Sequence, residues 1–408
     1  MSSNSLDLGV GLDTWTLTTR PETAVRLHRK LTPTRTGTSP GELLRNALEQ
    51  PFGFNSPLRS AVTAEDRVAI VLDEQLPHIG ELLAGIIAHL GSAGIQPAAI
   101  TVVVPPNGSG NTWIDDLPDE HADIRLEIHD TEDRNKLAYL ATTTDERRVY
   151  LNRTIVDADF VLVLSGRRFD PTLGYSGAEA TMFPVLSDAE TLASFVGKFT
   201  KKPPGTKTHD IREAAAEVTW MLGMPFFVQV ISGLGDTIQE IVTGLPPSTS
   251  EGIVRHEAYW RSTIDIQPDL VIAAISGDPK KTTFLHFAQA IAAASRVVQP
   301  GGRIVVLSTA TPRLEEGAEL IRQIDEPDNV PSILKKRKPD DWPAAALWTM
   351  AAKKAHLFLA SGFADEVSEE LFATPLHSVA EVQRLLDAAE HPLILPDAHK
   401  MMVELAEA

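Results

Sequence analysis

The sequence predicts an α/β protein with two domains, each built on a Rossmann-like parallel or mixed sheet flanked by helices, and with a cleft between them. Two stretches, 67–104 and 270–308, each carry a strand, a helix and a second strand in succession. A chain of 408 residues is also too long for a single hydrophobic core. We expect the first domain at 1–264 and the second at 265–389, with 390–408 packing back on the first.

Net charge and composition indicate which class of ligand the protein binds and in which cellular compartment it works. The formal net charge of −18 disfavours nucleic acid and anionic membranes as partners, because both repel an acidic surface. The chain has no cysteine, which excludes disulfides, thiolate nucleophiles and cysteine-ligated metal sites. The sequence has no run of about 18 apolar residues and no secretory signal pattern at its start. These features predict a cytoplasmic protein with a small-molecule ligand, and they leave a homo-oligomer open.

The first domain is expected to start with an edge hairpin around 6–17 and a helix that ends before Pro51. The apolar run 67–73 then predicts a strand, 79–94 an amphipathic helix with a glycine cap, and 100–104 the next strand. Parallel strands joined by a helix bring their carboxyl ends to one edge of a sheet. The polar loops that follow the two strands should therefore converge on one crevice.

The remaining elements are predicted from apolar periodicity and turn residues. In the first domain we expect helices at 188–199, 209–222 and 248–261, and a hairpin of strands at 225–231 and 237–244. In the second domain we expect strands at 270–274, 303–308 and 356–359, and helices at 280–298, 342–355 and 379–389.

The stretch 160–184 is the strongest candidate for a binding site. Its apolar start, 160–165, predicts a strand that is buried on both faces and ends at a turn at Gly166. The following loop leaves the carboxyl end of the strand, which is the edge where open α/β sheets bind ligands. At Ser176 and Gly177, backbone amides could approach a phosphate or carboxylate. The alternative is an ordinary glycine turn between a strand and a helix.

The same stretch resembles the family of nickel-pincer-nucleotide lactate racemases. The family pattern E-P-H-x-x-A-G-F-S-G-G-R-K-x-x-x-P is matched here by Asp170, Gly174, Tyr175, Ser176, Gly177 and Pro184. The overall plan is similar over nearly the full length. The resemblance implies a two-domain α/β fold and a racemase of 2-hydroxy acids, in which a hydride moves to and from the pincer cofactor while paired histidines handle the hydroxyl proton.

The residues that carry this chemistry in the family are replaced here. The resemblance places one acid/base histidine at Asp170 and the cofactor-anchoring lysine at Ala180. The second acid/base histidine falls at Asn107, which cannot take up and release a proton near neutral pH. The resemblance implies the nickel-ligating histidine around 194–198, and no histidine lies in 130–208. We therefore expect no metal site and no anchored pincer, and the cofactor of this chain is unknown.

Two further positions follow from the resemblance. The family has D-x-T-R-P after its first strand, where the aspartate and arginine contact the cofactor's nucleotide. Here Asp73 and Pro77 are kept, whereas Leu76 replaces the arginine and removes a bidentate partner for phosphate. In the second domain, His286 and Gln289 take the spacing of the family's substrate-facing Gln and Lys. We expect His286 to take over proton handling; the alternative is a packed histidine on a mostly apolar helix.

Three functional interpretations stay open. The first is a divergent member that binds a small hydroxy or carboxylic acid, or a nucleotide-like ligand, and works as an isomerase by a changed mechanism. Its cleft would be lined by Asp73, Asn107, Asp170, the loop 174–177 and His286, with His286 opposite Asp170. The second is a non-catalytic binding or regulatory paralogue. The third is a true nickel-dependent 2-hydroxyacid racemase whose reactive residues lie at other positions.

Overall fold

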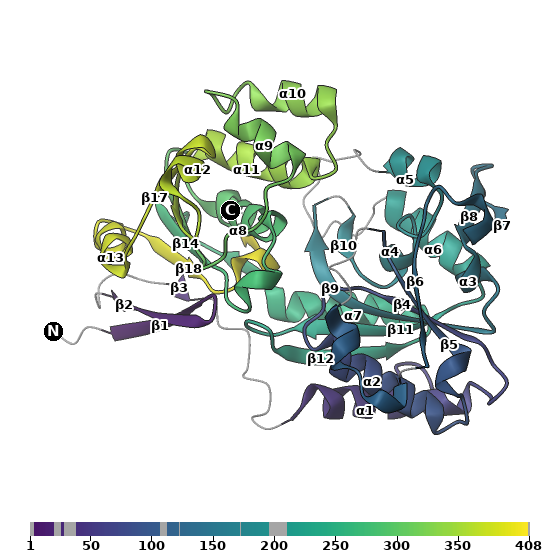
Figure 1. The fold of residues 1–408 in the computed structure, drawn as a ribbon. Coiled ribbons are helices and arrows are strands. Elements are labelled where there is room, and N and C mark those ends of the chain that lie inside the picture. Colours follow the sequence, from purple (N-terminus) through teal and green to yellow (C-terminus); the bar gives the residue numbers. More distant parts are fainter. Residues whose placement is uncertain are drawn as a thin grey trace. The chain divides into compact units, whose positions relative to one another are not determined.

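The computed structural model describes residues 4–19, 26–27, 38–106, 112–121, 123–171, 173–195 and 210–406. The chain divides into two units. The first unit comprises Leu31–Gly233 and Thr237–Ala258, and the second comprises Met1–Lys30, Leu234–Asp236 and Tyr259–Ala408. Each unit combines helices with a mainly parallel sheet (Figure 1), which confirms the predicted α/β class, while the expected cleft between the domains stays a prediction.

The first unit is organised on a seven-stranded sheet. Its strands are β4 (Val68–Leu72), β5 (Ile100–Val104), β6 (Arg125–Ile128), β9 (Phe160–Asp170), β10 (Gly174–Ser176), β11 (Phe226–Ser232) and β12 (Ile238–Gly244). Their order is β12-β11-β9-β4-β5-β6, and β10 pairs with β9. Strands β11, β9, β4, β5 and β6 run parallel, whereas β10 and β12 pair antiparallel with their neighbours.

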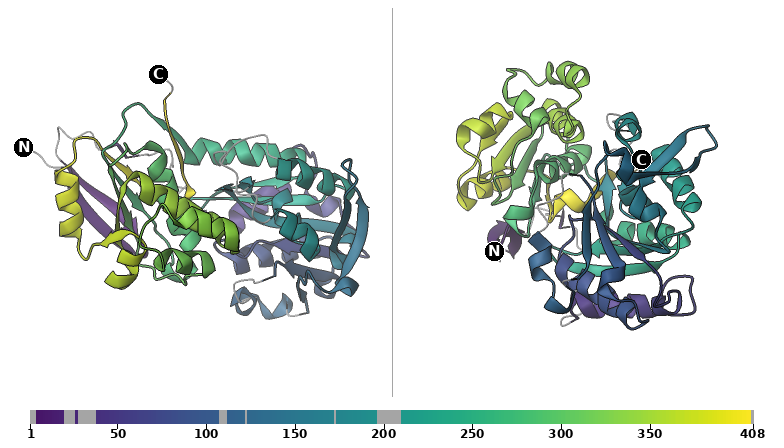
Figure 2. Two further views of the ribbon diagram at one scale, coloured as in Figure 1. Left: turned by 90° about the horizontal axis from the view of Figure 1, so that it is seen from above. Right: turned by 45° about the vertical axis from the view of Figure 1, so that its right-hand side comes forward.

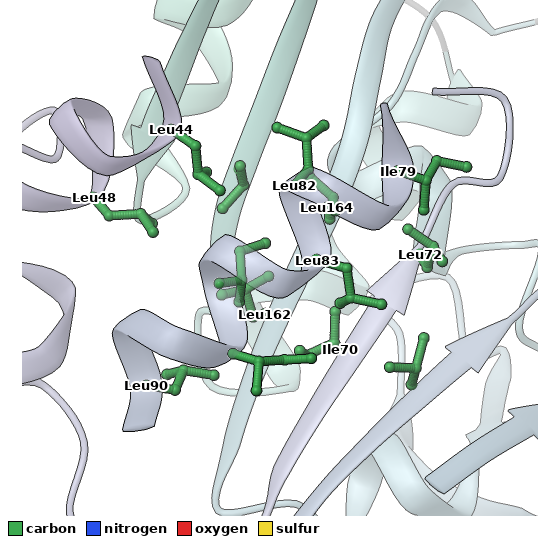
Figure 3. Close-up of a cluster of buried hydrophobic side chains, with 14 of the residues drawn as sticks. Leu44, Leu48, Ile70, Leu72, Ile79, Leu82, Leu83, Leu90, Leu162 and Leu164 are labelled. Carbon is green, nitrogen blue, oxygen red and sulfur yellow. The ribbon is translucent and has the colours of Figure 1, made fainter. Parts of the chain in front are cut away.

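Helices cover both faces of this sheet. The other elements of the unit are α1 (Pro40–Glu49), α2 (Ile79–Gly91), β7 (Leu137–Thr142), β8 (Arg148–Asn152), α3 (Arg153–Val156), α4 (Glu179–Met182), α5 (Ala189–Phe195), α6 (Asp210–Met221) and α7 (Pro247–Trp260). On one face, leucines of α1 and α2 pack against Ile70 and Leu164 (Figure 3). On the other face, Ile155 of α3 and Met182 of α4 pack against Val71 (Figure 2 gives two further views). Alternate side chains of β4 and β9 therefore enter two different cores, as expected of strands buried on both faces.

The second unit has a six-stranded parallel sheet of order β17-β16-β15-β14-β18-β3. Its strands are β3 (Arg26–Leu27), β14 (Leu270–Ala274), β15 (Arg303–Leu307), β16 (His356–Ala360), β17 (Ala373–Pro375) and β18 (Pro392–Leu395). Two smaller pairs join β1 (Asn4–Val10) to β2 (Asp13–Thr19) and β13 (Arg261–Ile264) to β19 (Met402–Leu405).

Helices and the β1–β2 hairpin cover this second sheet. The helices are α8 (Phe284–Val297), α9 (Glu316–Arg322), α10 (Val330–Arg337), α11 (Trp342–Lys354), α12 (Asp365–Glu370), α13 (Val379–Asp387) and the short 3-10 helix η7 (Ala398–Lys400). Leu8 and Leu17 of the hairpin share a core with Ile272 of β14 and Val382 of α13. Within the described residues of both units, no helix is long and apolar enough to span a membrane.

The structure differs from the predicted elements at three places. Strand β9 continues to Asp170 instead of ending at 165, so Gly166 lies within the strand and not in a turn. Helix α8 begins at Phe284 and not near 280, because Asp278 first caps a separate 3-10 turn. The N-terminal hairpin and strands β18 and β19 belong to the second unit, where β18 joins the sheet and β19 pairs with β13, although we expected them with the first domain. The apolar β18 forms a parallel ladder with β14, which draws the C-terminal segment into that sheet.

Candidate functional site

The strand order of the first unit changes direction between β4 and β9. From β4 the chain moves to β5 and then β6 on one side, and it returns to β9 on the other side of β4. At such a point the connecting loops separate, and open α/β sheets bind ligands there, beyond the carboxyl ends of the strands. The residues that follow β4 and those that end β9 therefore form the edge where a ligand of this unit is expected.

Asp73, the first residue after β4, is held by the protein itself. Its backbone N–H donates to the carbonyl of Leu164 at 2.9 Å, which extends the contact between β4 and β9. One carboxylate oxygen accepts the N–H of Gly166 at 3.1 Å, and the other accepts the N–H of Gln75 at 3.0 Å. The same carboxylate forms an ion pair with Arg168. Asp73 therefore orients Arg168, and its expected contact with a cofactor stays a prediction.

Arg168 supplies the positive charge of this edge. Its side chain is 22% exposed, beside Asp73 at 11%. A Cβ atom placed on Gly166 would lie 2.6 Å from Nη1 of Arg168 and 3.1 Å from Cδ2 of Leu76. Glycine at 166 thus leaves room for the guanidinium, which lies beside Leu76. Arg168 was not among the predicted site residues, because the strand was expected to end at 165. With the strand extended to 170, side-chain alternation indicates that Arg167 and Arg168 point to opposite faces.

Arg167 points to the opposite face of β9 and is buried, with 2% of its side chain exposed. It donates to Oε1 of Gln229 at 2.7 Å and to the carbonyls of Gly177 at 3.2 Å and Thr249 at 3.0 Å. Burial lowers the pKa of Arg167 to about 10, against the opposing effect of Glu179, whose carboxylate lies 3.6 Å away. The side chain is therefore still a cation at neutral pH, and it holds the glycine loop in place.

The glycine loop is the end of a tight hairpin. Ser176 of β10 pairs with Arg168 of β9. Gly177 has a φ of +85°, and a side chain there would collide with the backbone of β9. The N–H of Ala178 donates to Oγ of Ser165 at 2.7 Å. These contacts within the protein favour the ordinary glycine turn, and ligand binding by Ser176 and Gly177 stays a prediction.

Asp170 lies two residues beyond Arg168 on β9 and therefore on the same face of the strand. Its Oδ1 accepts the N–H of Leu173 at 2.7 Å, which closes the turn into β10, and the side chain is partly exposed. The structure thus gathers Asp73, Arg168 and Asp170 on one edge. Ala180, by contrast, is buried within α4.

The second unit carries His286 and Gln289 on α8, one turn apart and both partly exposed. Nδ1 of His286 accepts the N–H of Thr283 at 3.0 Å, which caps the helix. The neutral ring therefore holds its proton on Nε2. The ring also meets His399 edge-on, with 5.2 Å between the centroids. Because Asp170 belongs to the other unit, the expected approach of His286 to Asp170 stays a prediction.

The carboxyl edge of the second sheet has a polar cluster of its own. Strand order changes direction beside β14, and the buried Asp397 follows β18 there. Its carboxylate accepts the N–H of Gly235 at 2.6 Å, and the N–H and hydroxyl of Ser276 at 2.8 and 2.7 Å. Burial would raise the pKa of Asp397, but Lys400 and Ser276 outweigh burial and lower it. Burial and the charge of Lys400 hold the pKa of His399 well below its usual value, so its imidazole is neutral near pH 7.

Two of the predicted positions lie outside the described residues. They are Asn107 and the segment 196–209, which includes most of the region where the resemblance implies a nickel ligand. Within the described ranges, no group of three or more His, Cys, Asp or Glu side chains is arranged to hold a metal ion.

Comparisons with solved structures show the fold. The lactate racemase apoprotein from Thermoanaerobacterium thermosaccharolyticum is similar over 98% of this chain and 100% of its own, with a TM-score of 0.75 and 15% identity. A protein from Thermotoga maritima, solved by structural genomics, is similar over 90% of this chain and 99% of its own, with a TM-score of 0.68 and 13% identity.

A comparison of sequence identifies a family for the N-terminal part of the chain. No curated protein sequence matches the chain. The family model described as the lactate racemase N-terminal domain matches residues 13–204, which include β4, β9 and the hairpin with Asp170. Residues 13–204 of the chain therefore match the N-terminal domain of the lactate racemase family, and the whole chain is similar in fold to a lactate racemase.

Proposed function

We propose that this chain is a divergent lactate racemase-like isomerase that works without a covalently anchored nickel pincer. Its ligand would be a small 2-hydroxy or carboxylic acid, or a nucleotide-like molecule, bound at the carboxyl edge of the first sheet. The family match over residues 13–204 supports this class of ligand. The position of Asp73 and Asp170 on the edge where open α/β sheets bind ligands supports the place.

The observation that carries the divergence is Ala180. Covalent anchoring in the family needs a lysine amine at this position, and here a buried methyl group stands within α4. The preceding residue, Glu179, lies against the buried Arg167. The carboxylate of Asp73 already accepts two backbone N–H groups and an arginine. These residues do not fit a covalently held pincer nucleotide, so we derive no step through one.

The proposed chemistry uses a carboxylate and an imidazole. Asp170 would act as the general base that removes the proton from the α-carbon of the ligand, and a proton from solvent would return to the opposite face of that carbon. His286 would act as a donor toward a ligand oxygen, because its Nδ1 already accepts the N–H of Thr283 and its neutral ring carries the proton on Nε2. In this role His286 would take part in proton handling as a hydrogen-bond donor.

Co-expression with the enzymes that make the pincer nucleotide tests the proposal. We expect the intact mass to equal that of the unmodified chain and the nickel content to stay far below one ion per chain. A lactate racemase with the anchoring lysine, treated in the same way, is the positive control. An added cofactor mass with about one nickel per chain would instead identify a true nickel-dependent racemase.

The second candidate function is a non-catalytic binding or regulatory paralogue. It is favoured by the hydrogen bonds that both carboxylates of the site accept from the protein backbone. Asp73 accepts the N–H of Gly166, and Asp170 accepts the N–H of Leu173. Incubation of D-lactate and L-lactate with the protein in D2O separates the candidates. Deuterium at the α-carbon, lost in Asp170→Asn, supports the isomerase, whereas binding without exchange or inversion supports the paralogue.

A further inference from the structure

The adjacent arginines of β9 use their hydrogen-bond donors in different ways. Arg167 donates hydrogen bonds to Gln229 and to backbone carbonyls inside the protein. Arg168 contacts Asp73 through Nη2, and it has no other hydrogen-bond or ion-pair partner in the part of the chain that the structure describes. A guanidinium has five N–H donors. With its side chain 22% exposed, Arg168 therefore presents donors toward solvent at the carboxyl edge of the sheet.

We propose that Arg168, oriented by Asp73, binds the oxyanion of the ligand at this edge. Two neighbouring oxygens of a carboxylate or a phosphate match the planar fork of a guanidinium. The chemistry is the same for the carboxylate of a 2-hydroxy acid and for the phosphate of a nucleotide. This inference rests on the proposed function for the anionic nature of the ligand. The position of Arg168 at this edge follows from the strand order of the sheet and from the alternation of side chains along β9, independently of the proposed function.

The surroundings of Leu76 support the assignment. In the family pattern an arginine stands at the position of Leu76, and a glutamate stands at the position of Arg168. Here Nη1 of Arg168 and Cδ2 of Leu76 lie 2.6 and 3.1 Å from one point above Gly166. A guanidinium thus lies beside position 76, although it comes from the neighbouring strand. The positive charge at this edge is therefore on β9 and not in the loop after β4.

The acidic side chains at this edge form hydrogen bonds or ion pairs with other residues of the protein. Asp73 pairs with Arg168, Oε1 of Glu74 accepts the indole N–H of Trp113 at 3.0 Å, and Oδ1 of Asp170 accepts the N–H of Leu173. Hydrogen bonds from the protein spread the negative charge of a carboxylate and reduce its repulsion of an incoming anion. The acidic neighbours are therefore compatible with an anionic ligand on Arg168.

A matched control lies at the other end of the same two strands. Arg67 precedes β4 and Asp159 precedes β9, and they pair through Nε and Oδ2 at 2.9 Å and Nη2 and Oδ1 at 3.3 Å. This pair lies at the amino ends of parallel strands, away from the edge where such sheets bind ligands. Arg67→Gln therefore removes the same kind of ion pair from the same strands without changing the proposed site.

Calorimetric titration with D-lactate, L-lactate, AMP and inorganic phosphate tests the proposal on the full chain. We expect Arg168→Gln to weaken the binding of the anion by about tenfold or more, because a charge-assisted hydrogen bond is lost. Arg168→Lys should bind with intermediate affinity, since a lysine keeps the charge without the fork. Arg67→Gln should bind like the wild type. Circular dichroism and thermal unfolding of each variant check that it is folded.

A rescue variant makes the test independent of folding defects. Leu76→Arg in the Arg168→Gln background puts a guanidinium back beside Gly166, and we expect it to restore at least part of the lost affinity. Tighter binding of lactate than of AMP or inorganic phosphate would identify a carboxylate ligand. Tighter binding of AMP and of inorganic phosphate than of lactate would identify a phosphate ligand. Unchanged binding in Arg168→Gln, or an equal loss in Arg67→Gln, would overturn the assignment and leave the proposed function standing. Failure of the wild type to bind any of the four would overturn both.

Discussion

The amino and carboxyl ends of the strands β4 and β9 carry the same ion pair in different surroundings. At the amino end, Arg67 and Asp159 are 66% and 44% exposed, and their mutual hydrogen bond raises the pKa of Arg67 and lowers that of Asp159. At the carboxyl end, Asp73 and Arg168 are 11% and 22% exposed, and backbone N–H groups also fix Asp73. Solvent screens the first pair, whereas the second is an oriented charge at the edge where open α/β sheets bind ligands. We therefore expect the place of the pair on the sheet, and not the kind of pair, to decide which arginine binds a ligand.

Gly177→Val should have the largest effect, because it acts on the hairpin that carries the carboxyl end. A side chain at a φ of +85° would be strained and would also collide with the backbone of Gly166, so we expect a loss of about 5 kcal/mol or more in the free energy of unfolding. Urea denaturation measures it. Gly91→Val is the control, since no atom lies within 4 Å of a Cβ atom there. Normal stability with lost ligand binding would instead show that the loop contacts the ligand directly.

Arg167→Met should cause the second largest loss of stability, and a comparison with Arg168→Met tests whether the two arginines have different roles. It leaves Glu179 and the carbonyls of Gly177 and Thr249 without their buried cation, and removing one partner of a buried pair costs about 3–5 kcal/mol. Arg168→Met should cost much less stability, because that pair is partly solvated. Chemical denaturation of both variants gives the comparison. Equal losses would contradict the division into a structural and a ligand-facing arginine.

Asp397→Asn tests whether the carboxyl edge of the second sheet is structural. The folded protein lowers the pKa of Asp397 below its unfolded value of about 3.9, so the carboxylate stabilises the fold above that pH and loses this effect as the pH falls through the folded pKa. We expect the variant to lose about 1–3 kcal/mol at pH 7, because a hydrogen-bonded charge is removed. The difference from wild type should shrink below about pH 4. A difference that does not change with pH would exclude this role of the charge.

Arg67→Gln should have the smallest effect. Its pair with Asp159 is exposed, and solvent and salt screen such pairs. We expect the urea midpoint to equal that of the wild type at high salt and to fall only slightly at low salt. A large loss would mean that the amino end of the strands contributes more to the fold than its exposure indicates.

The sequence predicted the site only to the level of a sheet edge. Asp73 and Asp170 could be placed there because the apolar runs before them read as parallel strands. Arg168 was missed because polar residues after 165 resemble a loop. They continue the strand since β10 pairs with β9 and Asp73 accepts the N–H of Gly166. His286 was identified as a site residue, but its use of Nδ1 as a helix cap was not.

The sequence by itself determined the order of strands and helices, the missing lysine at Ala180 and the lack of histidine in 130–208, because these depend on residue identity and local periodicity. Only the tertiary structure decided which arginine of β9 presents donors to solvent. Alternation puts Arg167 and Arg168 on opposite faces, but their partners, Gln229 and Asp73, are far away in the sequence. The charge of a side chain is set by its residue type, whereas the donors that it has left for a ligand depend on what packs against it.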